Sequence, residues 1–366
     1  MHNPAPRLFT PLSLRGVTLP NRVVVSPMCQ YSAVEGCAQD WHLMHLGNLA
    51  VSGNGMLIME MTNVAAQGRI TPHCMGLYDD ACEQALARVI GFCRAHSHSV
   101  LAVQLAHAGR KASTRPPWAG RAALKPEDGG WQPLAPSAVA ASADDLLPRV
   151  LSADEIDDLI TAFADAARRA LRIGFDAIEL HAAHGYLLHQ FLSPLSNLRD
   201  DAYGGSLQNR MRFPLAVFDA VRAVWPEERP LGVRLSATDW IEGGWDMPQS
   251  LAFISELEAH GCDWIDVSSG GLSPAQRIVD GPGYQVPLAA EVKRHTRMAV
   301  MTVGRITEPR QAEDILTAGD ADLIAIARGM LYDPRWAWHA ADALGAEADY
   351  PAQYLRGRPA RCDGDR

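Results

Sequence analysis

The chain has 366 residues, 48% of them hydrophobic, and a formal net charge of -9 at pH 7. This length and composition predict a folded protein with a large core, and the negative charge argues against nucleic acid or an anionic membrane as the main partner. No run approaches the roughly 18 apolar residues of a membrane span, the N-terminal residues lack the pattern of a signal peptide, and seven cysteines without a C-x-x-C pair indicate reduced thiols in the cytoplasm.

Short runs rich in Val, Ile and Leu alternate with longer helical patterns, as expected for parallel strands buried on both faces. The runs predict eight strands, over 22–27, 55–60, 99–106, 175–182, 230–236, 264–269, 298–304 and 322–328. Helical periodicity predicts eight helices, over 42–52, 80–95, 152–174, 208–224, 249–260, 286–296, 309–318 and 335–344. In the clearest helix, Ser152 and Glu155 match a capping box and Gly174 closes the C-terminus.

Eight strand–helix alternations predict an α/β protein with a (β/α)8 TIM barrel, here as a single domain of residues 1–366. A doubly wound sheet is the alternative, but its G-x-G-x-x-G sequence is absent after the first strand. A barrel needs about 250 residues. The segment 107–150, rich in Gly, Pro and Trp, is therefore predicted to be an insertion that caps the active-site face, and 357–366 to be a disordered tail.

Catalytic groups of such a barrel lie at the C-terminal ends of the strands. Several strand ends in this sequence carry uncharged hydrogen-bonding side chains, which would suit a flat polar heterocycle. They are Ser26, Thr62, Gln104 and Ser268, together with Gln285.

The ends of the seventh and eighth strands read VGRIT and IARGM. Barrels commonly bind a phosphate at this place, where Gly allows close approach of the backbone and Arg offers a forked donor. Tight turns with surface arginines are the alternative. A phosphate site beside a polar heterocycle predicts a mononucleotide cofactor, for which FMN is the obvious candidate.

The stretch AIELHAAHGYLLHQFLSP places His181, His184 and Tyr186 at the mouth of the fourth strand. Three interpretations are open: a metal site with Glu179 or His107 as a further ligand, histidines held by the backbone, or imidazoles that stabilise a developing negative charge on an oxygen while Tyr186 delivers a proton. We favour the last and predict no metal site.

These residues and their surroundings resemble the Old Yellow Enzyme family of FMN-dependent ene-reductases, in its bacterial thermophilic-like branch with the xenobiotic reductases. The resemblance spans nearly the whole chain. Its most specific parts are VVVSPMCQYSA, QLAHAGRKAS, ELHAAHGYLLHQFLSPLSNLRDDAYGGSLQNRMRFPLAVFDAVR and IARGMLYDPRWAWHAA.

The resemblance implies roles for named positions. The flavin would be lined by Ser26, Pro27, Met28, Cys29, Met61 and Ser268, with Gln104 and Arg234 at its pyrimidine end and Val303, Gly304, Arg305, Ala327 and Arg328 near its phosphate. Cys29 would tune the redox potential of the flavin. The substrate would be held by His181 and His184 at its activating oxygen and flanked by Tyr31, Tyr186 and Gln285.

The implied reaction has two halves: NADPH or NADH reduces FMN, and a hydride then reaches the β-carbon of an α,β-unsaturated carbonyl or nitro compound while a proton reaches its α-carbon. Arg356 would cross into the neighbouring subunit of a homodimer or homotetramer. Met61 and Arg305 depart from the usual residues of the branch. The alternative function is a barrel aldolase or isomerase acting on a phosphorylated small molecule. An aldolase would need a Schiff-base lysine, and among only three lysines Lys111 is the candidate.

Overall fold

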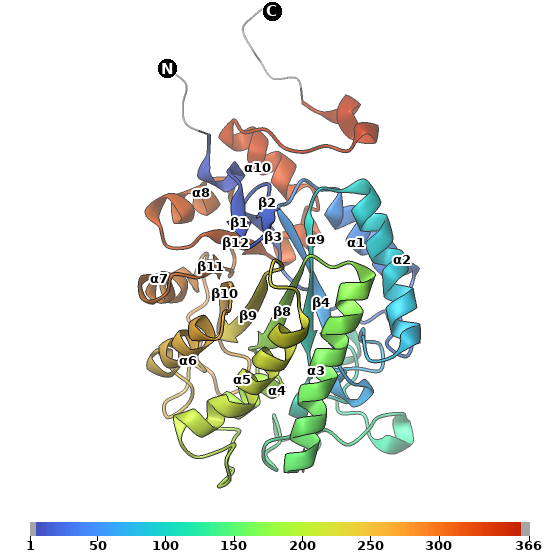
Figure 1. Ribbon diagram of the computed structural model, residues 1–366, viewed down its shortest axis with the longest axis vertical. Helices are drawn as coiled ribbons and strands as arrows, with labels where there is room; N and C mark the ends of the chain where they lie inside the picture. Colours follow the sequence, from blue (N-terminus) through green and yellow to red (C-terminus); the bar gives the residue numbers. More distant parts are fainter. Residues whose placement is uncertain (1–4, 360–366) are drawn as a thin grey trace, which may run out of the picture.

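The computed structural model describes residues 5–359, and the chain forms a closed barrel of eight parallel strands surrounded by helices (Figure 1). The barrel strands, in chain order, are β3 Val23–Val25, β4 Met56–Asn63, β5 Val100–Ala106, β8 Ala177–Ala182, β9 Leu231–Ser236, β10 Trp264–Ser268, β11 Ala299–Thr302 and β12 Leu323–Ile326. Each strand pairs with its neighbours in the sequence, and β12 pairs with β3 to close the ring. The predicted (β/α)8 barrel and its eight strands are confirmed.

The eight predicted helices are also present. They are α1 Asp40–Ala50, α2 Asp80–His96, α3 Ala153–Ile173, α5 Leu207–Val224, α6 Met247–Ala259, α7 Val286–His295, α8 Pro309–Ala318 and α10 Trp336–Leu344. In α3 the predicted capping box forms, because Ser152 accepts from the backbone N–H of Glu155 and the Glu155 side chain accepts from that of Ser152. Gly174 ends the helix at φ 97°, which few residues other than glycine adopt easily. None of the helices in residues 5–359 combines the length and apolar character needed to cross a membrane.

The last two barrel strands end earlier than predicted. Strand β11 stops at Thr302, because Gly304 and Arg305 have φ of 128° and 52° and so leave the extended region. Strand β12 stops at Ile326, and Arg328 already begins the short helix α9, Arg328–Tyr332. Neither α9 nor α4, Leu187–Leu192, is long enough to show helical periodicity in the sequence.

The two ends of the barrel differ. At the N-terminal ends of the strands, an antiparallel hairpin of β1 Leu12–Leu14 and β2 Val17–Leu19 buries Leu14 and Leu19 against the barrel interior, where they join an apolar cluster with Val24 and Met301. Sequence analysis missed this hairpin because three-residue strands carry almost no pattern. Figure 1 shows the hairpin at the top of the barrel and the blue-green segment 107–150 at the bottom, beside the opposite strand ends.

Segment 107–150 contains only short elements, including β6 Leu134–Ala135 and β7 Arg149–Val150. The buried Arg110 fastens it to the loop after β10 by donating to the carbonyl of Leu272 at 2.8 Å. Trp118 lies edge-on to Tyr31 with 5.7 Å between ring centroids. The segment therefore reaches the loop that follows β3, and its role as a cap stays a prediction. Of the predicted tail, 360–366 lie outside the described residues.

Replacing Ser152 by Ala should lower the free energy of unfolding by about 1 kcal/mol, because the N-terminus of α3 loses its side-chain acceptor. Urea denaturation of the two proteins measures the change. Thr161→Ala, on the exposed face of the same helix, is the matched control and should change that free energy by less than about 0.5 kcal/mol. Equal losses in both variants would contradict a specific role for the cap.

Candidate active site

Strand register stacks polar side chains in layers inside the barrel, above the apolar cluster. The lower layer pairs Gln104 with Glu179 across β5 and β8. The next layer aligns His181, Arg234 and Asp266 on β8, β9 and β10. Because side chains at alternate positions of a strand point to the same face, these groups follow one another toward the mouth of the barrel.

The two predicted histidines meet at that mouth. His184 Nδ1 lies 3.3 Å from His181 Nε2, and His184 Nε2 lies 2.7 Å from the hydroxyl oxygen of Ser268. His184 leaves the strand with φ 58°, and its backbone N–H donates to Ser236 Oγ. The buried His181 Nδ1 has no hydrogen-bond partner among the described residues.

Both imidazoles are neutral at pH 7. Burial, and next the charge of Arg234, lower the pKa of His181 and of His184 well below the usual value for histidine. A neutral imidazole has one N–H, so each histidine can donate only one hydrogen bond. In this structure the two rings contact each other and His184 contacts Ser268.

Lys111 fixes the loop that carries His184. Its ammonium group donates to the carbonyl oxygens of His184 at 2.8 Å and Gly271 at 2.7 Å, and it lies 5.3 Å from the centroid of the Tyr186 ring. Burial lowers the pKa of Lys111 to about 8. The sequence marks Lys111 only as a Schiff-base candidate and does not reveal this contact, since backbone acceptors leave no signature in a sequence.

Tyr186 and Cys29 line the same side of the mouth. The Tyr186 ring lies 5.1 Å from the His181 ring, and both Tyr186 and Cys29 pack on the apolar cluster that contains the buried Met61. Burial raises the pKa of the Tyr186 hydroxyl and of the Cys29 thiol well above their usual values, so both groups keep their protons at neutral pH. The unusual Met61 thus contributes apolar surface next to the predicted flavin position.

A cavity of about 500 Å³ runs from this mouth to the ends of β11 and β12. His184, Arg234 and Ser268 line one part of it, and Gly304 and Arg328 line another. Val303, Arg305, Ala327 and Gln285 contribute to its wall, as do Tyr284 and Tyr332, which sequence analysis did not single out.

Two of these side chains are already engaged by the protein. The Gln285 amide donates to the carbonyl of Val303 at 2.8 Å and accepts from Ser269 Oγ at 2.6 Å, so it serves as a fixed wall. Arg305 lies 2.8 Å from Asp280 and is half exposed, so part of its charge is balanced. Arg328 has no ion pair within the described residues.

The cavity suits a flat ring that carries a phosphate. At one end, the buried Arg234 donates to Ser26 Oγ at 3.0 Å and lies 3.1 Å from Asp266. At the other end, Arg328 and the backbone at Gly304 can receive an anion. Within residues 5–359, no three His, Cys, Asp or Glu side chains are grouped so as to hold a metal ion.

Among the predicted site residues, Arg356 lies at the opposite end of the barrel from this cavity. It is exposed in η6, Ala352–Gly357, which continues from a segment packed near the N-terminal ends of the strands, where Pro351 and Asn21 line one surface pocket. Figure 1 shows this red segment at the end of the barrel opposite to segment 107–150.

Comparison with known proteins identifies the family. The NADH:flavin oxidoreductase / NADH oxidase family matches residues 7–347. The chain is 41% identical over 352 residues to an NADPH dehydrogenase of Geobacillus thermodenitrificans (96% of this chain and 98% of the relative) and 41% identical over 355 residues to one of Bacillus subtilis (96% and 99%). The solved structure of morphinone reductase with tetrahydroNAD matches with a TM-score of 0.77 at 28% identity, over 100% of both chains. The chain therefore belongs to the NADH:flavin oxidoreductase / NADH oxidase family, the Old Yellow Enzyme family that its motifs resemble, and is an FMN-dependent oxidoreductase.

Proposed function

We propose that this NAD(P)H-dependent FMN ene-reductase binds an activated alkene with its carbonyl or nitro oxygen between His181 and His184. The observation that carries the proposal is the single cavity that joins His184 and Arg234 to Arg328, with His181 in contact with His184 at 3.3 Å. FMN held there would supply the hydride for the β-carbon of the alkene, with NADPH or NADH as the source of its electrons.

Arg328 and the backbone at Gly304 would hold the phosphate of FMN, with Arg305 at the rim. Gln104, Arg234 and Ser26 would face the pyrimidine end of its ring, and Pro27, Met28, Cys29, Met61 and Ser268 would lie along it. Arg234 is a fixed cation and would stabilise negative charge that develops on the ring. Cys29 enters as an uncharged thiol, so its influence on the ring would come from polarity and contact rather than from a thiolate.

The neutral histidines would act as hydrogen-bond donors to the activating oxygen. Donors fixed in a buried site stabilise charge that develops on that oxygen better than water does. Because its pKa is raised, the Tyr186 hydroxyl stays protonated at neutral pH. It would therefore be available to donate its proton to the strongly basic α-carbon. Tyr31, held against Trp118, would flank the substrate together with Gln285.

The reductant would bind in the same cavity. Morphinone reductase, which shares the fold over the full chain, was solved in complex with tetrahydroNAD, and the relatives from Geobacillus and Bacillus are NADPH dehydrogenases. We therefore propose NADPH or NADH as the electron donor of this protein. A reducing, cytoplasmic location agrees with the free thiols of the six cysteines in the described residues.

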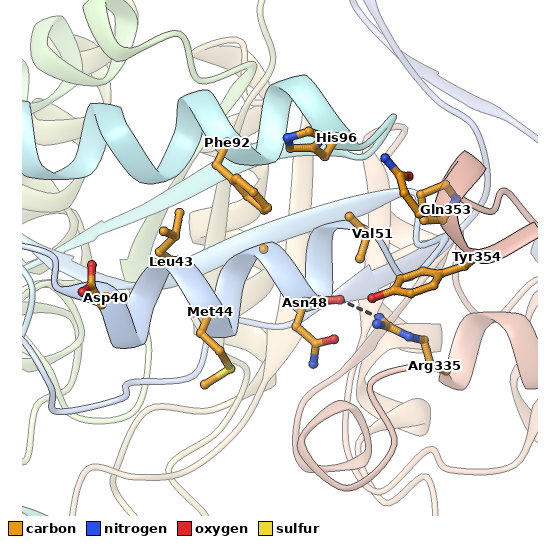
Figure 2. A pocket seen from close by; sticks show the side chains of 12 residues that line it. Asp40, Leu43, Met44, Asn48, Val51, Phe92, His96, Arg335, Gln353 and Tyr354 are labelled. Carbon is orange, nitrogen blue, oxygen red and sulfur yellow. Dashed lines mark hydrogen bonds between the residues drawn. The ribbon is translucent and has the colours of Figure 1, made fainter.

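We further propose a homodimer, or a homotetramer built from dimers, in which Arg356 reaches the active site of the partner. The active site of the chain that carries Arg356 lies at the opposite end of the barrel from the Arg356 segment (Figure 1). Beside the Arg356 segment, α1, α2 and η6 form a surface groove of about 530 Å³ that exposes Met44, Phe92 and Tyr354 (Figure 2). An apolar surface of this kind is typical of a subunit contact, and the second copy of this chain is its proposed occupant.

Arg328→Ala should weaken FMN retention by about 10-fold or more, because a charge-assisted contact to phosphate contributes about 1.5–3 kcal/mol. Flavin occupancy after dialysis, read from visible absorbance, measures the loss. Arg305→Ala is the matched control and should lose less, since Asp280 already engages that guanidinium. Full retention in Arg328→Ala would remove Arg328 from the phosphate site.

Replacing both His181 and His184 by Ala should slow alkene reduction by about 100- to 1000-fold for each donor lost, while reduction of FMN by NADPH changes less. Stopped-flow traces of the two half-reactions separate these effects. Phenols should bind to the parent protein as phenolates and give a long-wavelength absorption band over oxidised flavin, which the variant should lack. If a chelator abolished that band in the parent protein, a metal site would replace this proposal.

Arg356→Ala should raise the KM for alkene or NADPH by about tenfold, equivalent to about 1.4 kcal/mol of binding. Arg358→Ala, a neighbouring exposed arginine, should leave the KM unchanged. Co-expression of Arg356→Ala chains with His181→Ala/His184→Ala chains gives mixed dimers in which an intact histidine site meets an intact arginine from its partner. Recovery of a low-KM fraction supports action in trans, and a uniformly high KM contradicts it.

A further inference from the structure

Four polar side chains form a buried cluster beside and beneath the histidine pair. Gln104, Glu179, Arg234 and Asp266 come from the four successive strands β5, β8, β9 and β10, and each is at most 7% exposed. Gln104 Nε2 donates to Glu179 Oε1 at 2.8 Å, and Arg234 Nε lies 3.1 Å from Asp266 Oδ2. The two carboxyl groups thus each hold one of the two side chains proposed to face the pyrimidine end of FMN.

A buried ion pair is by itself weak evidence of a contribution to stability. The layer below them is apolar, with Val24, Ile58 and Met301 among its members. Gly232 leaves room for the Trp264 ring, because a Cβ at Gly232 would lie 2.0 Å from that ring. Neither oxygen of Asp266 accepts a hydrogen bond within the described residues. Buried ion pairs often stabilise a fold no better than well-packed apolar groups of similar size, so the retention of two acids here indicates a function.

The charges of the cluster balance only if one proton is shared. Arg234 supplies one positive charge against two carboxyl groups. Burial, and next the charge of Asp266, raise the pKa of Glu179 to about 8, while Arg234 opposes that shift. Besides these two, the groups that face Glu179 are the neutral Gln104 and Trp264, and the histidines above are uncharged. Burial raises the pKa of Asp266 as well, and the charge of Arg234 opposes that rise. Because Asp266 is the carboxyl in contact with Arg234, the proton is held on Glu179 near neutral pH.

We propose that Glu179 and Asp266 are positioning residues for the cofactor. They orient the Gln104 amide and the Arg234 guanidinium, and together they take up a proton when negative charge develops beside Arg234. Because the Gln104 Nε2 group is committed to Glu179, its carbonyl oxygen is left to accept from a ring N–H. Negative charge next to Arg234 partly cancels the positive charge that favours the ionised forms of Glu179 and Asp266. In protein molecules whose Glu179 and Asp266 are both ionised, the Glu179 carboxylate then takes up a proton from solvent.

This inference rests on the proposed placement of the flavin, and its signature is the number of protons taken up per two electrons. In this cluster the pKa of Glu179 is raised to about 8, and negative charge beside Arg234 would raise it further. Below about pH 7 the proton is present in both states, so no extra uptake occurs. From about pH 8 upward, until the higher pKa is passed, reduction should draw one additional proton.

The test is a spectroelectrochemical titration of the FMN-loaded enzyme at a series of pH values, in which the slope of midpoint potential against pH gives the proton count. Glu179→Gln keeps an acceptor for Gln104 and should lose the additional proton above pH 8 while retaining flavin. Asp266→Asn removes the charge that raises the pKa of Glu179, so the additional uptake should move to lower pH, which a merely structural lesion would not produce.

Glu60→Gln is the matched comparison. Glu60 is also buried, and burial raises its pKa to about 8, but it accepts from the backbone N–H of Gln30 outside the cluster. Its replacement should leave the additional uptake intact. An unchanged proton count in Glu179→Gln, or its loss in Glu60→Gln instead, would overturn the proposal. Failure of the histidine proposal is distinguishable, because it alters the phenol band and the alkene half-reaction without changing the proton count.

Discussion

The positive charge of Arg234 inside the barrel is the constraint on which the site depends. A guanidinium cannot release its proton at any ordinary pH, so neighbouring groups must adapt to it. It lowers the pKa of His181 and His184, opposes the rise in the pKa of Glu179, and lies against Asp266. Burial is the larger cause of these pKa shifts. Arg234 adds to it at the imidazoles and opposes it at the two carboxyl groups.

This arrangement favours hydride chemistry over the rival functions of a barrel. Uncharged imidazoles that contact each other and Ser268 are suited to donate hydrogen bonds to an oxygen. The ammonium group of Lys111 is committed to two backbone carbonyls, which leaves it poorly placed to attack a substrate as an aldolase lysine would. The family assignment and the local geometry therefore agree on the class of reaction.

Much of the fold was predictable because buried parallel strands and amphipathic helices carry strong patterns, and α3 with its capping box was predicted almost to the residue. The location of the candidate active site was predictable because a barrel brings the C-terminal ends of all its strands together. Contacts that depend on register between distant strands were not predictable. Asp266 received no role in the sequence, since its pairing with Arg234 emerges only when β9 and β10 align. The role of Lys111 was hidden for a similar reason, because its partners are carbonyl oxygens.

The hairpin of β1 and β2 has a consequence for the order of events during turnover. Its buried leucines fill the barrel interior at the N-terminal ends of the strands, so reactants approach the flavin position from the opposite end. In the proposed arrangement, the nicotinamide and the alkene would both approach the ring on the side of His181 and His184. In that arrangement they would occupy the site alternately, with the oxidised nicotinamide leaving before the alkene enters. The kinetics would then be ping-pong, and each reactant would compete with the other at high concentration.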